Sequence, residues 1–139
     1  MAERLITHKQ AVDIVRRYAG REWGEIVYSV EKGIPGLRVM PDVVTYWEKK
    51  GKRTYTICEI KTDRSDLQRA FFQLEMAKEG LLKEGAVNCF VAVTRYLMAD
   101  MDKAQWDDFV NSLKRKGYGL LVVFSTKVEL RVPALIEER

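Results

Sequence analysis

The stretch that most constrains the fold is RVMPDVVTYWEKKGKRTYTICEIKTD, which runs from residue 38 to residue 63. Its two halves are rich in β-branched and aromatic residues, as strands are. Lys50-Gly51 between them predicts a two-residue hairpin turn, because glycine tolerates a positive φ. Each predicted strand also carries a carboxylate within an apolar run, Asp42 on the first and Glu59 on the second. Such charges are rare inside strands unless they are paired or bind a metal.

The length of the hairpin loop sets the register of these two strands. A loop of two or four residues places Asp42 directly opposite Glu59, with Cβ atoms about 4.5–5.5 Å apart. Lys61 lies two residues beyond Glu59 and therefore points to the same face of the sheet. The sequence thus predicts that two carboxylates and one lysine converge, whereas a three-residue loop with a bulge would separate them.

Such a cluster has two chemical interpretations. Two adjacent carboxylates repel each other, so one keeps its proton unless a cation lies between them. Carboxylate oxygens and the carbonyl of Ile60 suit Mg²⁺, which also retains waters and accepts phosphate oxygens. Lys61 could then hold or deprotonate an attacking water, or neutralise charge in the transition state. The alternative is a buried ion-pair cluster with no chemical role, which is costly to desolvate.

Hydrophobic periodicity and capping signals predict the remaining elements. Thr7 and Ser65 each begin a helix, and Gln10 and Gln68 complete the two capping boxes. The run NCFVAVT, residues 88–94, is apolar throughout, as in a central strand covered on both faces. The expected elements are a helix over 7–20, a strand over 25–31, the two hairpin strands, a helix from 65 to 80 or 85, a strand over 88–94, a helix over 102–116, and strands over 119–125 and 128–132.

This order of elements predicts the fold class. Three antiparallel strands come first, and a crossover helix then leads to a strand that runs parallel in the same sheet. We therefore expect an α/β protein, a three-layer sandwich with a central mixed β-sheet, in a single domain over residues 1–139. The strand over 128–132 is followed by Pro133 and is expected at an edge of the sheet.

Composition narrows the class of protein. No apolar run approaches the roughly 20 residues of a membrane span, and the N-terminus lacks the apolar core of a signal peptide, so we expect a cytoplasmic protein without membrane contacts. Cys58 and Cys89 are far apart, lie in apolar runs and lack metal-ligand spacing. We expect both to be buried, which argues against an iron–sulfur or zinc site.

The charge of the chain is modestly basic, with a net charge of +4 and a pI near 9.1. The basic residues are clustered in a way that suits a polyanion, although any one such cluster is more often ordinary solvated surface. The clusters are Arg16, Arg17 and Arg21; Lys49, Lys50, Lys52 and Arg53; Arg64 and Arg69; and Lys114, Arg115 and Lys116.

The pattern Pro41-Asp42, sixteen intervening residues and Glu59-Ile60-Lys61 resembles the signature of the PD-(D/E)xK nuclease superfamily. The predicted order over residues 7–94, about two thirds of the chain, also resembles the αβββαβ core of its restriction-endonuclease-like fold. The resemblance implies a metal-dependent nuclease that hydrolyses DNA phosphodiester bonds and usually leaves a 5′-phosphate. Asp42, Glu59 and the Ile60 carbonyl would bind Mg²⁺ or Mn²⁺, and Lys61 would assist the attacking water.

A looser similarity links the chain to archaeal Holliday-junction resolvases, through size, basic charge and core order. Such enzymes cut two strands as dimers, so the resemblance implies that this chain could form a homodimer. The strand over 128–132 and the apolar surface near Trp47 are the candidate interfaces.

The sequence departs from the family pattern in the first helix, where many members carry an additional acid. His8 and Gln10 stand at the expected place, and we expect His8 to be a surface residue. Glu25 is the preferred substitute, because a turn near residues 34–35 would bring it within about one diagonal of Asp42. Glu22, Asp13 and His8 itself are the alternatives for this fourth position.

Four further residues are candidates for substrate binding. Gln73 matches a glutamine that many family members carry on the helix after the lysine, although Ala77 stands where the exonuclease branches have tyrosine. A polar residue at the border of the apolar stripe is the structural alternative for Gln73. Arg69, Lys50 and Lys52 supply positive charge for DNA.

Two other functions remain open from the sequence. A catalytically silent member of the fold could bind nucleic acid or another protein, and the missing helix acid favours this interpretation. The intact Asp42, Glu59 and Lys61 argue against it. A metal-independent RNA-cleaving enzyme typically needs histidine, and His8 is the only histidine in the chain.

Overall fold

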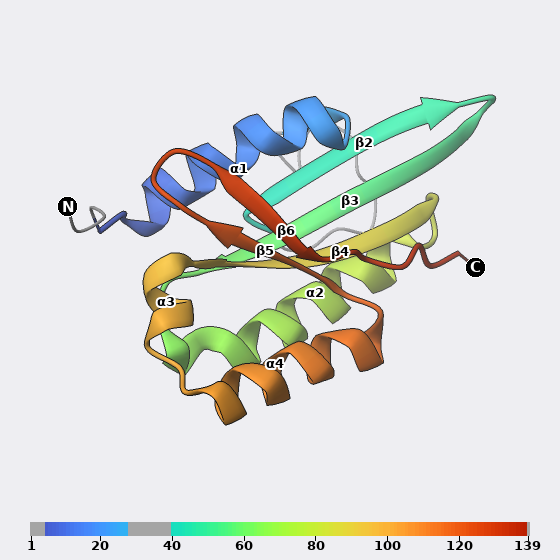
Figure 1. Ribbon diagram of the computed structural model, residues 1–139. Helices are drawn as coiled ribbons and strands as arrows, with labels where there is room; N and C mark the ends of the chain where they lie inside the picture. Colours follow the sequence, from blue (N-terminus) through green and yellow to red (C-terminus); the bar gives the residue numbers. More distant parts are fainter. Residues whose placement is uncertain (1–4, 28–39, 139) are drawn as a thin grey trace.

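The structure is a computed structural model that describes residues 5–27 and 40–138. A six-stranded sheet in the order β1-β2-β3-β4-β5-β6 runs through the molecule, with helices on both faces (Figure 1). The elements are α1 (His8–Glu22), β1 (Glu25–Ile26), β2 (Val43–Lys49), β3 (Lys52–Lys61), the 3-10 turn η2 (Arg64–Asp66), α2 (Leu67–Leu81), β4 (Ala86–Thr94), α3 (Arg95–Ala99), α4 (Lys103–Lys116), β5 (Gly119–Val123) and β6 (Val128–Val132).

The predicted hairpin is formed by β2 and β3. Lys50 and Gly51 have φ angles of 53° and 78°, the positive values required by the two-residue turn that suits twisted strands. The pairing covers all seven residues of β2 and ends with Val43 opposite Cys58. The two-residue loop and its register are therefore confirmed.

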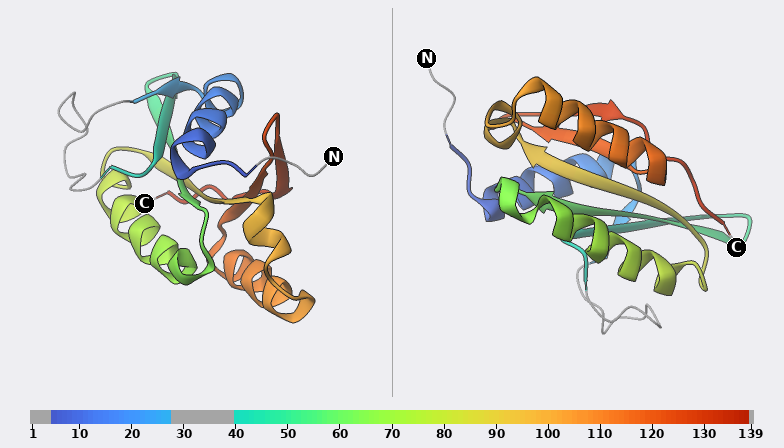
Figure 2. Two further views of the ribbon diagram at one scale, coloured as in Figure 1. Left: turned by 90° about the vertical axis from the view of Figure 1, so that its left-hand side faces the viewer. Right: turned by 90° about the horizontal axis from the view of Figure 1, so that it is seen from below.

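The sheet is mixed, as the order of elements predicts. β1, β2 and β3 are antiparallel, β3, β4 and β5 are parallel, and β6 returns antiparallel to β5 at the edge. α1 covers one face, while α2 and α4 lie side by side on the other, as Figure 2 shows from below. The three-layer α/β sandwich and its αβββαβ core are confirmed.

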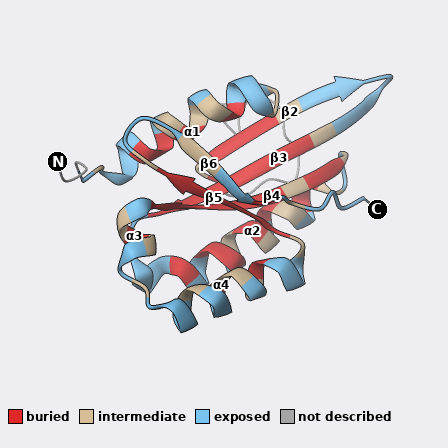
Figure 3. Ribbon diagram, viewed as in Figure 1, coloured by how far each residue is buried: buried red, intermediate tan, exposed pale blue. Residues whose placement is uncertain are grey.

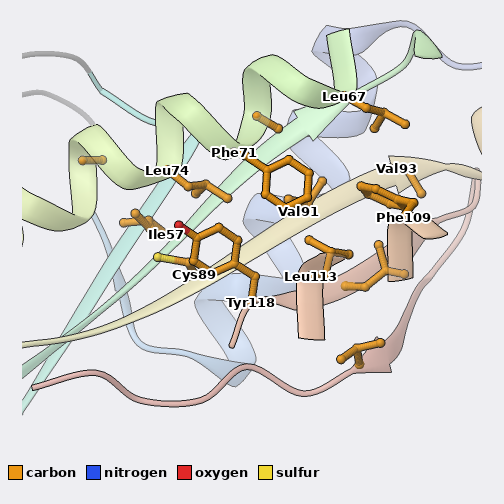
Figure 4. Packing of buried hydrophobic residues seen from close by; sticks show 14 of the residues in the cluster. Ile57, Leu67, Phe71, Leu74, Cys89, Val91, Val93, Phe109, Leu113 and Tyr118 are labelled. Carbon is orange, nitrogen blue, oxygen red and sulfur yellow. The ribbon is translucent and has the colours of Figure 1, made fainter. Parts of the chain in front are cut away.

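Side chains of the central strands alternate between two apolar clusters. On one face Ile57 packs with Phe71 of α2 and Phe109 of α4 (Figure 4). On the other face Cys58 and Ile60 pack with residues of α1. Because burial on both faces of β3 fixes which residues point which way, a slip by one residue would exchange the two clusters.

Both cysteines are buried, as predicted. Burial raises the pKa of the Cys89 thiol to about 12 and the pKa of Cys58 well above its usual range. Both thiols are therefore protonated at neutral pH, and a thiolate ligand for a metal is disfavoured.

The capping prediction is confirmed for the first helix and wrong for the second. Thr7 and Gln10 form the reciprocal capping box of α1. Ser65 does not cap α2, because Asp63 accepts the hydrogen bond from the Ser65 backbone nitrogen at 3.0 Å and begins the 3-10 turn instead. α2 starts only at Leu67. The side chains of Asp63 and Ser65 can both accept a hydrogen bond from a nearby backbone nitrogen, and the sequence does not show which of them begins the helix.

Other boundaries shift by a few residues. β4 begins at Ala86 and β5 ends at Val123, each two residues earlier than predicted, and the short helix α3 was not predicted. α4 begins at Lys103, because Asp102 is its N-cap and forms a capping box with Gln105. Of the strand predicted over 25–31 the structure describes β1, and its later part lies outside the described residues together with the turn near residues 34–35. Among the described helices, none combines the length and apolarity needed to cross a bilayer.

Candidate functional site

The two ends of β2 and β3 that lie away from the turn bring the predicted site residues together. Asp42 immediately precedes β2, and Glu59 and Lys61 are at the end of β3. The Asp42 carboxylate oxygen Oδ2 accepts a hydrogen bond from the Ile60 backbone nitrogen at 2.8 Å. This bond fixes Asp42 beside Glu59, so the convergence predicted from the register is observed.

Glu59 is a buried carboxylate next to a second carboxylate, with 4 % of its surface exposed. Burial and, to a smaller extent, the negative charge of Asp42 raise the pKa of Glu59 to about 8, although the positive charge of Lys61 opposes both effects. The pair therefore holds a proton at neutral pH when no cation is bound. A divalent cation between the two carboxylates would replace that proton.

Lys61 is 8 % exposed and donates a hydrogen bond from Nζ to the Gln73 side-chain oxygen Oε1 at 2.8 Å. Gln73 lies on α2, and this contact fixes the lysine's position from outside the hairpin. The glutamine thus has a partner in the site and is more than a polar residue at the border of an apolar stripe.

His8, which the sequence offered only as an alternative to Glu25, also reaches the site. Its ring nitrogen Nε2 lies 3.2 Å from Asp42 Oδ2 and 3.1 Å from the Ile60 carbonyl oxygen. Its side chain is half exposed, at 51 %, so the expectation of a surface residue is confirmed, and the ring contacts the candidate site as well. The sequence signal for His8 was its place on the first helix, where many members of the PD-(D/E)xK superfamily carry an acid.

Glu25 does not take that place. The predicted register is wrong, because Glu25 pairs with Tyr46 of β2 and not within one diagonal of Asp42. Its carboxylate accepts a hydrogen bond from the Tyr46 hydroxyl, which raises the pKa of the tyrosine. Asp13 and Glu22 are exposed on α1. Of the four candidates for the additional position, His8 is the one that contacts Asp42.

The donor set around Asp42 fits a hard divalent cation. It consists of the Asp42 and Glu59 carboxylates and the Ile60 carbonyl, which matches the preference of Mg²⁺ for one or two carboxylates with several retained waters. Within residues 5–27 and 40–138 no group of three or more His, Cys, Asp and Glu side chains is arranged as a metal cluster. A site formed only by protein ligands, as for structural zinc, is therefore not what these residues offer.

A groove of about 530 Å³ opens beside Glu59. It runs along α2, and its lining includes Pro41, Gln73, Arg69, Phe72, Met76 and Lys83. Phe72 and Met76 are 66 % and 51 % exposed, so this wall is apolar and open to solvent. The volume lies in the range of small-ligand sites, and Arg69 and Gln73 are both placed to meet a ligand there. Lys50 and Lys52 lie instead at the opposite end of β3.

Comparison with known proteins supports the fold. No protein-family model matches the chain, and no curated protein matches it significantly. A solved protein of unknown function from Silicibacter pomeroyi matches with a TM-score of 0.56 and 22 % identity, over 96 % of this chain and 75 % of that one.

Two further solved structures are similar over nearly their whole length. An fdxN element excision controlling factor protein from Anabaena variabilis has a TM-score of 0.55 and 13 % identity, over 88 % of this chain and 98 % of that chain. A XisH family protein from Nostoc punctiforme has a TM-score of 0.54 and 11 % identity, over 87 % of this chain and 98 % of that chain. At these identities the likeness shows the fold alone.

Proposed function

We propose that this chain is a metal-dependent nuclease that hydrolyses phosphodiester bonds in DNA. The observation that carries the proposal is the convergence of Asp42, Glu59 and Lys61 at one end of the hairpin, beside a groove lined by Glu59. These residues also carry the resemblance to the PD-(D/E)xK superfamily. The net charge of +4 favours a polyanionic substrate.

Asp42, Glu59 and the Ile60 carbonyl would hold Mg²⁺ or Mn²⁺. Bound there, the ion would act as a Lewis acid on the phosphate and lower the pKa of a bound water. The chain itself supplies two adjacent carboxylates that are fixed before any ligand arrives. The hydrogen bond from the Ile60 nitrogen to Asp42 is the contact that orients one of them.

Lys61 is the cation that meets the reacting phosphate. Its ammonium group has three donors, one of which is used by Gln73, so others are available to a water or a phosphate oxygen. Attack by water forms one P–O bond and breaks the bond from phosphorus to the 3′ oxygen. That oxygen gains a proton as the water loses one, so the products are a 3′-hydroxyl and a 5′-phosphate. Lys61 stabilises the negative charge that develops on the phosphoryl oxygens, and its burial strengthens that interaction.

A catalytically silent module that binds nucleic acid is the second candidate. One observation favours it: the α1 residue that contacts Asp42 is His8, whereas Asp13 and Glu22 of this helix are exposed. The buried Lys61–Gln73 contact favours the nuclease instead, because a module that only binds has no evident need for a desolvated lysine beside two carboxylates.

The decisive experiment is cleavage of labelled single-stranded, duplex, flap and four-way-junction DNA in Mg²⁺ or Mn²⁺, with an EDTA control. Lys61→Ala should lower the rate about 10²–10³-fold, the usual effect of removing one group that stabilises charge in the transition state. Lys103→Ala removes the same charge from a lysine whose side chain is 89 % exposed on α4 and should leave the rate unchanged.

The outcomes separate the two candidates. Metal-dependent cutting that is lost in Lys61→Ala supports the nuclease, and a preference for the four-way junction would support the looser similarity to resolvases. Retained, salt-sensitive DNA binding with no cutting of any substrate would favour the silent module. Loss of the circular dichroism spectrum in Lys61→Ala would indicate that the cluster is structural.

A further inference from the structure

The outer part of the β2–β3 hairpin extends beyond the body of the protein (Figure 1). β1 pairs with β2 only as far as Tyr46, and β4 begins beside Thr54, so beyond these residues the hairpin has no described neighbouring strand. Its side chains change there from buried to exposed, which Figure 3 shows by the change from red to blue. A lone two-stranded ribbon adds little stability, so core packing does not explain this extension.

Positive charge is concentrated at this tip. The tip consists of Lys49, Lys50, Gly51, Lys52 and Arg53. Arg53 lies near Glu48, at 3.5 Å, and over the ring of Tyr46. The three lysines have no carboxylate partner in the parts of the chain that the structure describes. Like charges held this close on paired strands repel each other, and a polyanion would relieve that repulsion.

The turn gives independent support. Lys50 is the one non-glycine residue with a positive φ among the described residues. A turn of this type favours asparagine, aspartate or glycine at that position. Lysine there is strained, and such backbone outliers occur preferentially at functional sites. The lysine side chain, and not the geometry of the turn, therefore accounts for its presence.

We infer that this tip, residues 49–53, binds a DNA duplex about one helical turn away from the bond that is cut. Lys52 and Lys61 are the first and last of the ten residues of β3, and at about 3.3 Å per residue they lie about 30 Å apart. With a rise of about 3.4 Å per base pair this distance is about nine base pairs, close to the 10–10.5 of one turn. At that interval the same groove faces the protein again.

The position of the cut in this inference rests on the proposed nuclease activity, whereas duplex binding by the tip can be measured without cleavage. We would measure binding of a 24-base-pair duplex by fluorescence anisotropy in EDTA at several salt concentrations. Lys50→Asn creates the favoured Asn-Gly turn, so its melting temperature should be no lower than that of the wild type. Its affinity should nevertheless fall several-fold, and the slope of log affinity against log salt should decrease by about 1.

Lys103→Gln is the matched control, because it removes one charge from an exposed lysine of α4. It should leave both affinity and salt slope unchanged. The variant with Lys49→Gln, Lys50→Asn and Lys52→Gln together should lower the slope by about 3. Equal affinity of wild type and Lys50→Asn, equal losses in Lys50→Asn and Lys103→Gln, or no duplex binding at all would overturn the inference.

A series of duplexes tests the spacing. In Mg²⁺ the cleavage rate of the wild type should fall several-fold once the duplex on one side of the cut is shorter than about nine base pairs. This length dependence should be weaker in Lys50→Asn and absent from the variant with Lys49→Gln, Lys50→Asn and Lys52→Gln together. Wild-type binding without cleavage would refute the nuclease while leaving the tip as a duplex-binding element. If the cleavage rate depends neither on duplex length nor on Lys50, the tip does not bind the duplex, although the proposed nuclease activity would be supported.

Discussion

At one end of the β2–β3 hairpin, Glu59 and Lys61 are 4 % and 8 % exposed, while at the other end Lys49 and Lys52 are open to water. The same two strands thus carry charge in two physical environments. At the buried end two charged groups have a partner on a helix: Lys61 contacts Gln73 of α2, and Asp42 contacts His8 of α1. At the tip the lysine side chains are exposed to solvent.

In the function that we propose, this difference places the reaction at the buried end of the hairpin and DNA binding at its exposed tip. Low dielectric at the buried end strengthens electrostatic interactions and shifts a pKa, which is what a reaction centre requires. High dielectric at the tip weakens each interaction but leaves three lysines available to a partner. The regular rise of β3 fixes the distance between the two environments.

Stability should depend on the buried end far more than on the tip. Ile57 is fully buried between β3 and the α2–α4 layer, so Ile57→Ala should destabilise the fold by about 2–5 kcal/mol through lost burial and a cavity. Lys52→Ala at the tip should change the free energy of unfolding by no more than about 0.5 kcal/mol. Urea denaturation followed by circular dichroism measures both. Similar losses in the two variants would contradict the proposed division of the hairpin.

The protonation of Glu59 should make the metal-free protein less stable as pH rises. The pKa of Glu59 is raised from an ordinary 4.5 to about 8. Between these values the folded state holds a proton that the unfolded state has lost. The free energy of unfolding should therefore decrease with rising pH in this window, by up to about 1.4 kcal/mol per pH unit. Above pH 8 Glu59 is ionised in both states, so it should no longer make the free energy of unfolding depend on pH.

Urea denaturation in EDTA at pH 5, 6, 7 and 8 would measure this slope. Titrating groups that do not interact with Glu59 contribute equally to the wild type and to Glu59→Gln, so the difference between the two proteins reports the Glu59–Asp42 pair. The variant should have the shallower pH dependence. Parallel curves would mean that Glu59 is ionised in the folded protein, as an acid exposed to water would be.

Loss of the contact between His8 of α1 and Asp42 should affect cleavage and metal affinity more than it affects the stability of the fold. His8 touches two of the three groups that would hold Mg²⁺, namely Asp42 and the Ile60 carbonyl. His8→Ala should lower metal affinity or cleavage about 10–100-fold, the usual effect of losing a group that orients metal ligands. Mn²⁺ titration by calorimetry and cleavage rates at saturating Mn²⁺ would separate the two effects.

Lys9→Ala is the control, since Lys9 is the exposed neighbour of His8 on the same helix. It should leave metal affinity unchanged. If His8→Ala instead lowers the melting temperature while metal affinity stays at the wild-type value, the His8–Asp42 contact is a structural link between α1 and the hairpin.

Local signals explain why much of the fold could be predicted. The Thr7–Gln10 capping box and the Lys50-Gly51 turn depend on neighbours within four residues, and both are confirmed. Ser65 failed as a helix cap because Asp63, two residues away, competes for the same role. The register of Glu25 failed because it depends on a long connection, whose geometry the sequence does not encode in any short pattern.

The sequence by itself determined the hairpin, its register and hence the meeting of Asp42, Glu59 and Lys61, because a two-residue turn and the two-residue period of strands are local rules. The tertiary structure alone decided that His8 reaches Asp42 across 34 residues and the Ile60 carbonyl across 52. It also decided that Glu59 is the carboxylate whose pKa burial raises, and that the hairpin tip extends into solvent (Figure 1). Those features follow from the packing of helices on the sheet, and packing sets burial, dielectric and the neighbours of each charge.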